Sequence, residues 1–287
     1  MSHRPVVSCN QLESIGRGDL SHVGFVFLKG FLDAQETSAV RTAVESLRSS
    51  AAHSGCIRPN NTLLPLRWNE PVVQMVIGSE LRRQILSLAV GADDLRWISG
   101  YVSTKEPKSP PLWWHQDWWC WDHPVTFRRQ AAQIAVLCFL NLADRHNGAL
   151  RILPRSHRAS LPIRAILPEA HGQAAGALGP EHPAMSDIDG QLTVRVQEGD
   201  AIAIDYRLLH STYTNDSSSG RDCLLLTFTP SWSQLPDDIQ AHLVDRPAQP
   251  TANEMPGAEM QRVLPQFAGE RRSLCLNRNA PREFNMG

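Results

Sequence analysis

The chain has 287 residues, of which 42% are hydrophobic and 20% charged, as in ordinary globular proteins. Its 28 basic and 29 acidic residues leave a formal net charge of -1, and no basic run suits a nucleic-acid backbone or an anionic membrane surface. Neither partner is expected. The six cysteines are scattered without a C-x-x-C pair, which argues against a zinc knuckle or a disulfide framework. The first residues lack the apolar run of a secretion signal, so we expect a cytoplasmic protein.

The first third of the chain predicts one strand followed by a helical layer. Residues 24–32, GFVFLKGFL, predict a strand. A helix is expected next, because Asp33 and Glu36 stand at the two positions of a capping box. Residues 70–90 predict a second helical stretch, with Pro71 in its first turn and a glycine after its end. We expect this layer to cover residues 33–92.

From residue 95 onward the pattern changes to short strands separated by turns. The predicted strands are LRWISGYVST, LWWHQDWW, QIAVLCFLNL, GALRILP, LTVRVQ, AIAIDY and CLLLTFTP. Strands at this density favour an antiparallel sandwich or barrel, expected over residues 95–232. Residues 158–190 interrupt the series with little periodicity, which is typical of a lid or an insertion. Residues 233–287 are expected to form an irregular cover, and the whole chain, 1–287, a single domain.

The stretch LWWHQDWWCWDHP, residues 112–124, predicts a metal site. Residues two apart on a strand share a face, so His115 and Asp117 can both reach one ion. The best third ligand is His210, at the end of a later strand. Two histidines and one carboxylate form the ligand set of non-haem iron(II) oxygenases and leave three coordination positions open. Two of them can take 2-oxoglutarate and the third O2.

A co-substrate with a second carboxylate also needs a cation. Arg221 follows His210 by eleven residues, enough for the chain to turn and return along a neighbouring strand. A guanidinium can hold a carboxylate through two parallel hydrogen bonds. Thr212 lies two residues after His210 on the same face and can add a hydroxyl.

At these residues the chain resembles the phytanoyl-CoA dioxygenase-like group of Fe(II)/2-oxoglutarate-dependent oxygenases. The similar blocks are GFVFLKGFLDAQE, WWHQDWW, NLADRHNGALRILPRSH and EGDAIAIDYRLLHSTYTNDSSSGRDCLLLTF. The third is similar to the family segment N-G-x-L-x-x-x-P-x-S-H, with Arg155 where the family usually has glycine. The resemblance implies a mostly β protein with flanking helices around a double-stranded β-helix, the jelly-roll core that cupins share. It assigns iron to His115, Asp117 and His210, and the co-substrate to Arg221, Thr212 and Gln133.

The resemblance further implies an oxygenase that hydroxylates an unactivated C–H bond and releases succinate and CO2. We expect a small organic substrate, such as a natural-product intermediate, because this family serves varied substrates and the cluster is rich in tryptophan. Desaturation or cyclisation stays open, as does the oligomeric state. The residues expected to contact substrate are Trp113, Trp119, Trp121, Asp122 and His123. The remaining histidines of this part, His146, His171 and His182, are expected in loops or at the surface, and His157 in a structural role.

Three alternatives remain open from the sequence. An acyl-CoA hydroxylase would need cations for the substrate phosphates, and those near the predicted site are Lys105, Lys108, Arg128 and Arg129. A non-catalytic sandwich could bind a ligand on its tryptophans and would not need Arg221. A zinc hydrolase or cupin-type isomerase could use the same three metal ligands.

Overall fold

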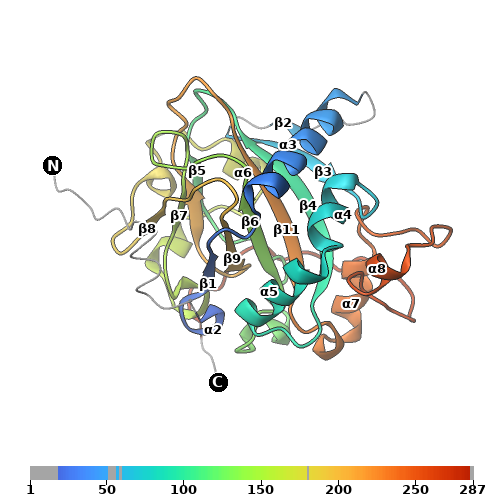
Figure 1. The fold of residues 1–287 in the computed structure, drawn as a ribbon. Coiled ribbons are helices and arrows are strands. Elements are labelled where there is room, and N and C mark those ends of the chain that lie inside the picture. The colour runs from blue at the N-terminus through green and yellow to red at the C-terminus, as the bar shows by residue number, and fades with distance from the viewer. Residues whose placement is uncertain (1–18, 51–55, 58–59, 180, 285–287) are drawn as a thin grey trace.

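Two antiparallel sheets form the centre of the protein in the computed structural model, which describes residues 19–50, 56–57, 60–179 and 181–284 (Figure 1). In that part the larger sheet has seven strands in the order β1-β9-β6-β11-β4-β3-β2, and the smaller has four in the order β5-β10-β7-β8. This arrangement confirms the predicted mostly β fold with a jelly-roll core.

Most strands lie close to the segments predicted from turn-bounded runs. The larger sheet contains β1 (Phe25–Leu28), β2 (Cys56–Ile57), β3 (Thr62–Leu66), β4 (Arg96–Lys105), β6 (Ile134–Phe139), β9 (Ala201–Asp205) and β11 (Arg221–Thr229). The smaller contains β5 (Leu112–His115), β7 (Leu150–Ile152), β8 (Leu192–Val194) and β10 (His210–Thr212). On β11, Leu224 and Leu226 pack toward the helices while Cys223 packs between the sheets. β2, β3 and β10 were not predicted as separate strands, and His210, expected at the end of a strand, instead begins β10.

Helices cover the outer face of the larger sheet (Figure 1). Helix α3 (Ala34–Ser49) begins with the expected capping box, in which the Asp33 and Glu36 carboxylates each accept the other residue's backbone N–H at 2.8 Å. The single helical stretch predicted over residues 70–90 is two helices, α4 (Pro71–Ile77) and α5 (Glu80–Val90), because Ser79 caps a new helix. A four-residue helix, α2 (Leu20–Val23), precedes β1. No helix within the described ranges combines the length and apolar character needed to cross a bilayer.

The described residues of the segment 158–190 form short helical turns. They are η2 (Ser156–Arg158), η3 (Pro162–Ala165), α6 (Gln173–Gly176) and η4 (Pro183–Met185), of which α6 and η4 pack on β5. Ala175 and Met185 pack on Trp113, and the Trp114 indole N–H donates to the Ser186 carbonyl at 2.8 Å. These contacts hold the segment against the smaller sheet.

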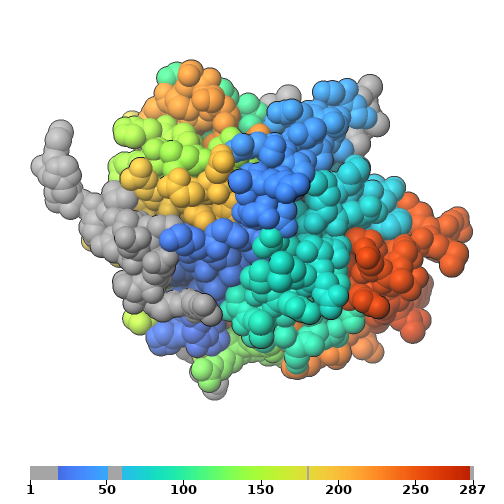
Figure 2. Space-filling view, in the orientation of Figure 1, coloured from blue at the N-terminus to red at the C-terminus, as the bar shows by residue number. Residues whose placement is uncertain are grey.

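The C-terminal segment contains more regular structure than expected. It includes η5 (Trp232–Gln234), α7 (Asp237–Val244) and α8 (Ala258–Gln261). Figure 2 shows its red residues forming a continuous surface with α4. Met260 and Leu264 pack in the same apolar cluster as Val73 of α4. The segment is therefore joined to the helical layer and does not lie loosely over the core.

The block NGALRILPRSH aligns the strand that carries His210. Gly148 has a φ of +84°, and a Cβ there would lie 2.6 Å from the stem of Lys105, so only glycine fits. Further along, the Ser156 hydroxyl accepts the backbone N–H of Leu209 at 2.8 Å. This bond fixes the backbone immediately before His210.

Arg155, which stands where the family has glycine, adopts a left-handed backbone with a φ of 66°. Its side chain is exposed. Arg155→Gly should therefore raise the free energy of unfolding by about 0.5 to 1 kcal/mol, because glycine removes the strain of a Cβ at positive φ. Chemical denaturation measures the change. Arg158→Gly, in the same turn, is the control and should lower stability; an equal loss in both variants would contradict the account.

Candidate metal centre

His115 and His210 face each other across two paired strands. They are register partners on β5 and β10, and their ring centroids lie 4.2 Å apart. Each Nδ1 lies at hydrogen-bond distance from a backbone carbonyl two residues earlier, 2.9 Å from Trp113 O and 3.0 Å from Leu208 O. If each Nδ1 carries the proton and donates it, each Nε2 is left with a lone pair, which is the form that binds a metal.

Asp117 adds a carboxylate between the two imidazoles. Its Oδ1 lies 3.6 Å from Nε2 of His115, and its Oδ2 lies 3.5 Å from Nε2 of His210. Two ligand atoms that each lie about 2 Å from the same ion are roughly 3 to 4 Å apart from each other. The observed separations are of this size, so one ion can bind all three side chains. Burial acts to raise the pKa of Asp117, but the surrounding imidazoles outweigh it and hold that pKa below its usual value. Burial lowers the pKa of His115 well below its usual value. A carboxylate anion and a neutral imidazole are the ligating forms.

A fourth side chain, His171, also reaches this centre. It is exposed and lies in a turn, as expected, but its contact with the site was not predicted. Its Nε2 lies 2.7 Å from Asp117 Oδ1, and its ring lies edge-on to His115 at 4.9 Å. Among the residues that the structure describes, single donor atoms of His115, Asp117 and His171 fall within 4.8 Å of one another. His171 has a φ of 62°, a conformation rare outside glycine and often found at functional sites. No spacing in the sequence signals it, since it follows Asp117 by 54 residues in a segment without periodicity.

We expect His171→Ala to weaken metal binding about tenfold, because partners of a ligating carboxylate typically contribute that much to affinity. Competition with a chelator, using Fe(II) or Co(II), measures the change. His146→Ala is a suitable control, since His146 is an exposed loop histidine. Equal affinity in parent and His171→Ala would show that the contact with Asp117 does not support the metal.

Arg221 is a buried cation without a carboxylate partner in the described part of the chain. It is 5% exposed, its Nε has no hydrogen-bond partner, and its guanidinium carbon lies 5.4 Å from the centre of the Phe139 ring. Its register partner is the equally buried Lys105. Burial lowers the pKa of both side chains, that of Lys105 to about 7 with a further contribution from Arg221. A buried guanidinium without a carboxylate partner favours an anionic ligand, because an uncompensated buried charge costs several kcal/mol.

The other two predicted co-substrate residues belong to or adjoin strands of different sheets. The Thr212 hydroxyl accepts the backbone N–H of Leu112 at 3.4 Å. Gln133 lies just before β6, and its amide oxygen accepts the Trp119 indole N–H at 2.8 Å. Only Gln133 of the three lines the cavity described next.

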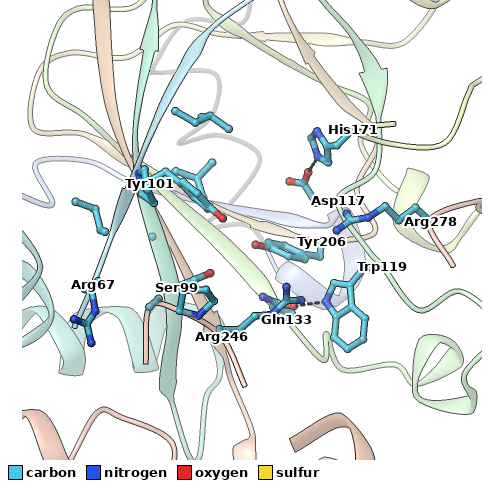
Figure 3. A pocket seen from close by; sticks show the side chains of 17 residues that line it. Arg67, Ser99, Tyr101, Asp117, Trp119, Gln133, His171, Tyr206, Arg246 and Arg278 are labelled. Atoms are coloured by element: carbon cyan, nitrogen blue, oxygen red, sulfur yellow. Dashed lines mark hydrogen bonds and ion pairs between the residues drawn. The ribbon is translucent and has the colours of Figure 1, made fainter. Parts of the chain in front are cut away.

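A cavity of about 550 Å³ opens beside Asp117 (Figure 3). Asp117 and His171 stand at one side of it, and the hydroxyl groups of Tyr101 and Tyr206 point into it. The remaining lining residues are Leu63, Pro65, Leu66, Arg67, Ser99, Gly100, Trp119, Gln133, Leu225, Arg246, Pro247, Ala248 and Arg278. A cavity of this size next to a metal centre can hold a small organic molecule.

Of the five predicted substrate contacts, Trp119 alone lines this cavity. Trp113 packs under the segment 158–190, and Trp121 packs edge-on to Phe284. His123 caps η1 (Pro124–Phe127) through its Nδ1, and Asp122 is exposed. The aromatic cluster is therefore mostly core, because the strand ends at His115 and its two-residue alternation does not continue. The four cations proposed for an acyl-CoA substrate also lie outside the cavity lining.

Comparisons with known proteins identify a family and similar folds. Residues 20–223 match the family described as Phytanoyl-CoA dioxygenase (PhyH). No curated protein matches the chain. Among solved structures, the chain is similar to SnoN, a non-haem alpha-ketoglutarate-dependent epimerase from nogalamycin biosynthesis, with 18% identity, a TM-score of 0.56 and coverage of 92% of this chain and 98% of SnoN. It is also similar to HygX from Streptomyces hygroscopicus, solved with nickel and 2-oxoglutarate, with 18% identity, a TM-score of 0.56 and coverage of 79% and 88%. The carbocyclase SnoK from nogalamycin biosynthesis gives 20% identity, a TM-score of 0.53 and coverage of 77% and 84%.

Proposed function

The chain belongs to the phytanoyl-CoA dioxygenase family, and on that premise we propose that it is a non-haem iron(II)- and 2-oxoglutarate-dependent oxygenase. The main support is that Asp117 lies 3.6 Å from its near neighbour His115 and 3.5 Å from His210, which is distant in sequence. A ligand set of two imidazoles and one carboxylate leaves coordination positions open for co-substrate and O2. A closed structural zinc site would instead use four protein ligands.

In this proposal each residue has a defined task. His115, Asp117 and His210 hold the iron, which supplies activation of O2 and oxidation of a substrate C–H bond as 2-oxoglutarate is converted to succinate and CO2. Arg221 binds the remote carboxylate of 2-oxoglutarate, with Thr212 and Gln133 as further contacts. Trp119 and the two tyrosines border the cavity and limit access of water to the reacting atoms.

The proposed reaction is hydroxylation of a small natural-product intermediate. The similar structures include an epimerase and a carbocyclase of nogalamycin biosynthesis, so this fold supports several outcomes of substrate oxidation. The cavity volume of about 550 Å³ suits a substrate of moderate size. An acyl-CoA substrate is less well supported, because its phosphates would need a cluster of cations that the four predicted residues do not provide at the cavity.

The decisive experiment is anaerobic loading with Fe(II) and 2-oxoglutarate followed by exposure to air. We expect a weak visible charge-transfer band before exposure and release of succinate afterwards, even without the prime substrate. A non-catalytic ligand-binding sandwich would give neither signal. A zinc hydrolase or isomerase would bind metal without the band, and absence of both signals at saturating ligand would overturn the proposal.

A further inference from the structure

The C-terminal segment delivers two arginines to the wall of the cavity. Arg246 follows α7, and Arg278 lies in the extended chain near the C-terminus; both line the cavity (Figure 3). Backbone pairing fixes the position of Arg278, because Asn277 donates to the Trp119 carbonyl at 2.9 Å and its own carbonyl accepts from Trp121 at 3.1 Å. The segment is thus tied to the strand end that carries Asp117.

A third arginine that lines the cavity, Arg67, forms an ion pair within the protein. Its guanidinium contacts both carboxylate oxygens of Glu254, at 2.7 and 2.9 Å. That charge is already compensated within the protein. Arg67 therefore gives no reason to expect an anionic ligand, and it serves as an internal comparison.

Arg246 contacts no carboxylate among the described residues. Its Nη2 lies 2.7 Å from His242 Nε2, and burial together with Arg246 lowers the pKa of His242 to about 4, so this imidazole is uncharged at pH 7. The guanidinium carbon lies 5.8 Å from the centre of the Trp119 ring. The adjacent Asp245 accepts a hydrogen bond from the Ser273 hydroxyl and acts to raise the pKa of Arg246, but the two side chains form no ion pair. Arg246 thus faces the cavity with its charge uncompensated by a contacting carboxylate.

Arg278 makes no ion pair within the part of the chain that the structure describes. It repels Arg246, and burial and this repulsion both act to lower the pKa of Arg246. The only acidic residue among the described lining residues is Asp117, whose carboxylate is assigned to the metal. The cavity wall therefore carries two positive charges that no protein group at the wall neutralises.

We propose that the prime substrate is an anion, carrying a carboxylate, sulfate or phosphate that Arg246 and Arg278 bind, on a body that packs against Trp119 and the apolar wall. This inference rests on the proposed function, since it names the substrate class of that active site. Guanidinium groups bind such oxyanions through charge-assisted hydrogen bonds. Leu66, Leu225 and Pro247 supply apolar surface for the body of the molecule.

The co-substrate does not account for these two charges. Its remote carboxylate is assigned to Arg221, which is buried beside Lys105 and does not line the cavity. Its other carboxylate is assigned to the metal. Arg246 and Arg278 are therefore available to bind a different anion. That anion would lie in the cavity that Asp117 also lines, where a substrate must bind.

A matched pair of probes tests the proposal: 2-naphthoate and the neutral 2-naphthamide, titrated calorimetrically into the anaerobic Fe(II)/2-oxoglutarate complex. We expect the parent protein to bind the carboxylate about tenfold more tightly than the amide, as charge-assisted bonds typically provide. Arg246→Gln combined with Arg278→Gln should reduce that ratio to less than about threefold while KM for 2-oxoglutarate, from succinate release, stays unchanged. Arg67→Gln is the control and should retain the preference.

Three outcomes would overturn the inference. The parent could show no preference for the carboxylate, or the double variant could keep the full preference. In the third outcome, the only effect of the double substitution would be a higher KM for 2-oxoglutarate. The last would assign the arginines to the co-substrate. Repeating the titration on metal-free protein separates this inference from the proposed function. If the protein prefers the anion but shows neither a charge-transfer band nor succinate release, the proposed oxygenase function is rejected. The proposed anion-binding site then still stands.

Discussion

Asp117→Ala should reduce 2-oxoglutarate-dependent succinate release to below about one-thousandth of the parent rate, equivalent to roughly 4 kcal/mol of transition-state stabilisation. The carboxylate lies between the two imidazoles and is the only anion among the three proposed ligands. Removing it leaves two neutral donors, which bind a hard divalent ion weakly. Steady-state succinate release and the iron content of the reconstituted protein both measure the effect.

Two variants make this result specific. Asp117→Asn keeps the shape of the side chain but not its charge, so it should lose activity almost as completely. Asp122→Ala removes a nearby exposed carboxylate and should retain activity. If Asp117→Ala kept parental turnover and iron content, the metal would lie elsewhere and the proposed centre would have to be abandoned.

The fold could be predicted largely because its signals are local. The capping box at Asp33 and Glu36 depends on neighbours in sequence, and so do the turn-bounded runs that become β4 and β11. The prediction failed for elements whose position depends on contacts between distant parts of the chain or on a single residue. β3 contains a proline and gains its place by pairing with β4, and the break between α4 and α5 needs only one serine cap.

The candidate site likewise contains residues that a local motif predicts and residues that only the folded chain brings together. His115 and Asp117 share a strand-spaced motif, and His210 faces His115 through strand pairing. His171 carries no comparable signal, because an irregular segment reaches Asp117 only after packing on Trp113. Strand alternation places Trp113 beside His115, with ring centroids 6.1 Å apart, but the segment 158–190 packs on it and Trp113 does not line the cavity.

Arg246 and Arg278 lay in a segment that sequence patterns describe only as irregular. Their position depends on α7 and on the pairing of Asn277 with Trp119 and Trp121, contacts that bring together parts of the chain more than a hundred residues apart. Neither residue type nor spacing distinguishes them from surface arginines. The chemistry of the metal could thus be read from short motifs, whereas the recognition of substrate depends on the assembled fold.

Arg221→Ala should raise KM for 2-oxoglutarate about a hundredfold while turnover at saturating co-substrate falls only several-fold, because the lost contact is with a part of the molecule that does not react. Succinate release at varied 2-oxoglutarate measures both constants. Arg48→Ala is the matched control: Arg48 pairs with Asp222, the residue next to Arg221, in an exposed ion pair, and its loss should leave KM unchanged. A parental KM in Arg221→Ala would contradict the assignment.

Stability gives an independent measurement on the same residue. Arg221 is buried beside Lys105 without a carboxylate partner among the described residues, so in ligand-free protein its charge opposes folding. Arg221→Met, which keeps most of the volume, should therefore melt at the parental temperature or above it when no co-substrate is present. With metal and saturating 2-oxoglutarate the order should reverse, because the parent gains the binding free energy of the ligand and the variant gains little of it. A variant that melts well below the parent without ligand would mean that Arg221 stabilises the fold itself, and a carboxylate site at this position would lose its physical basis.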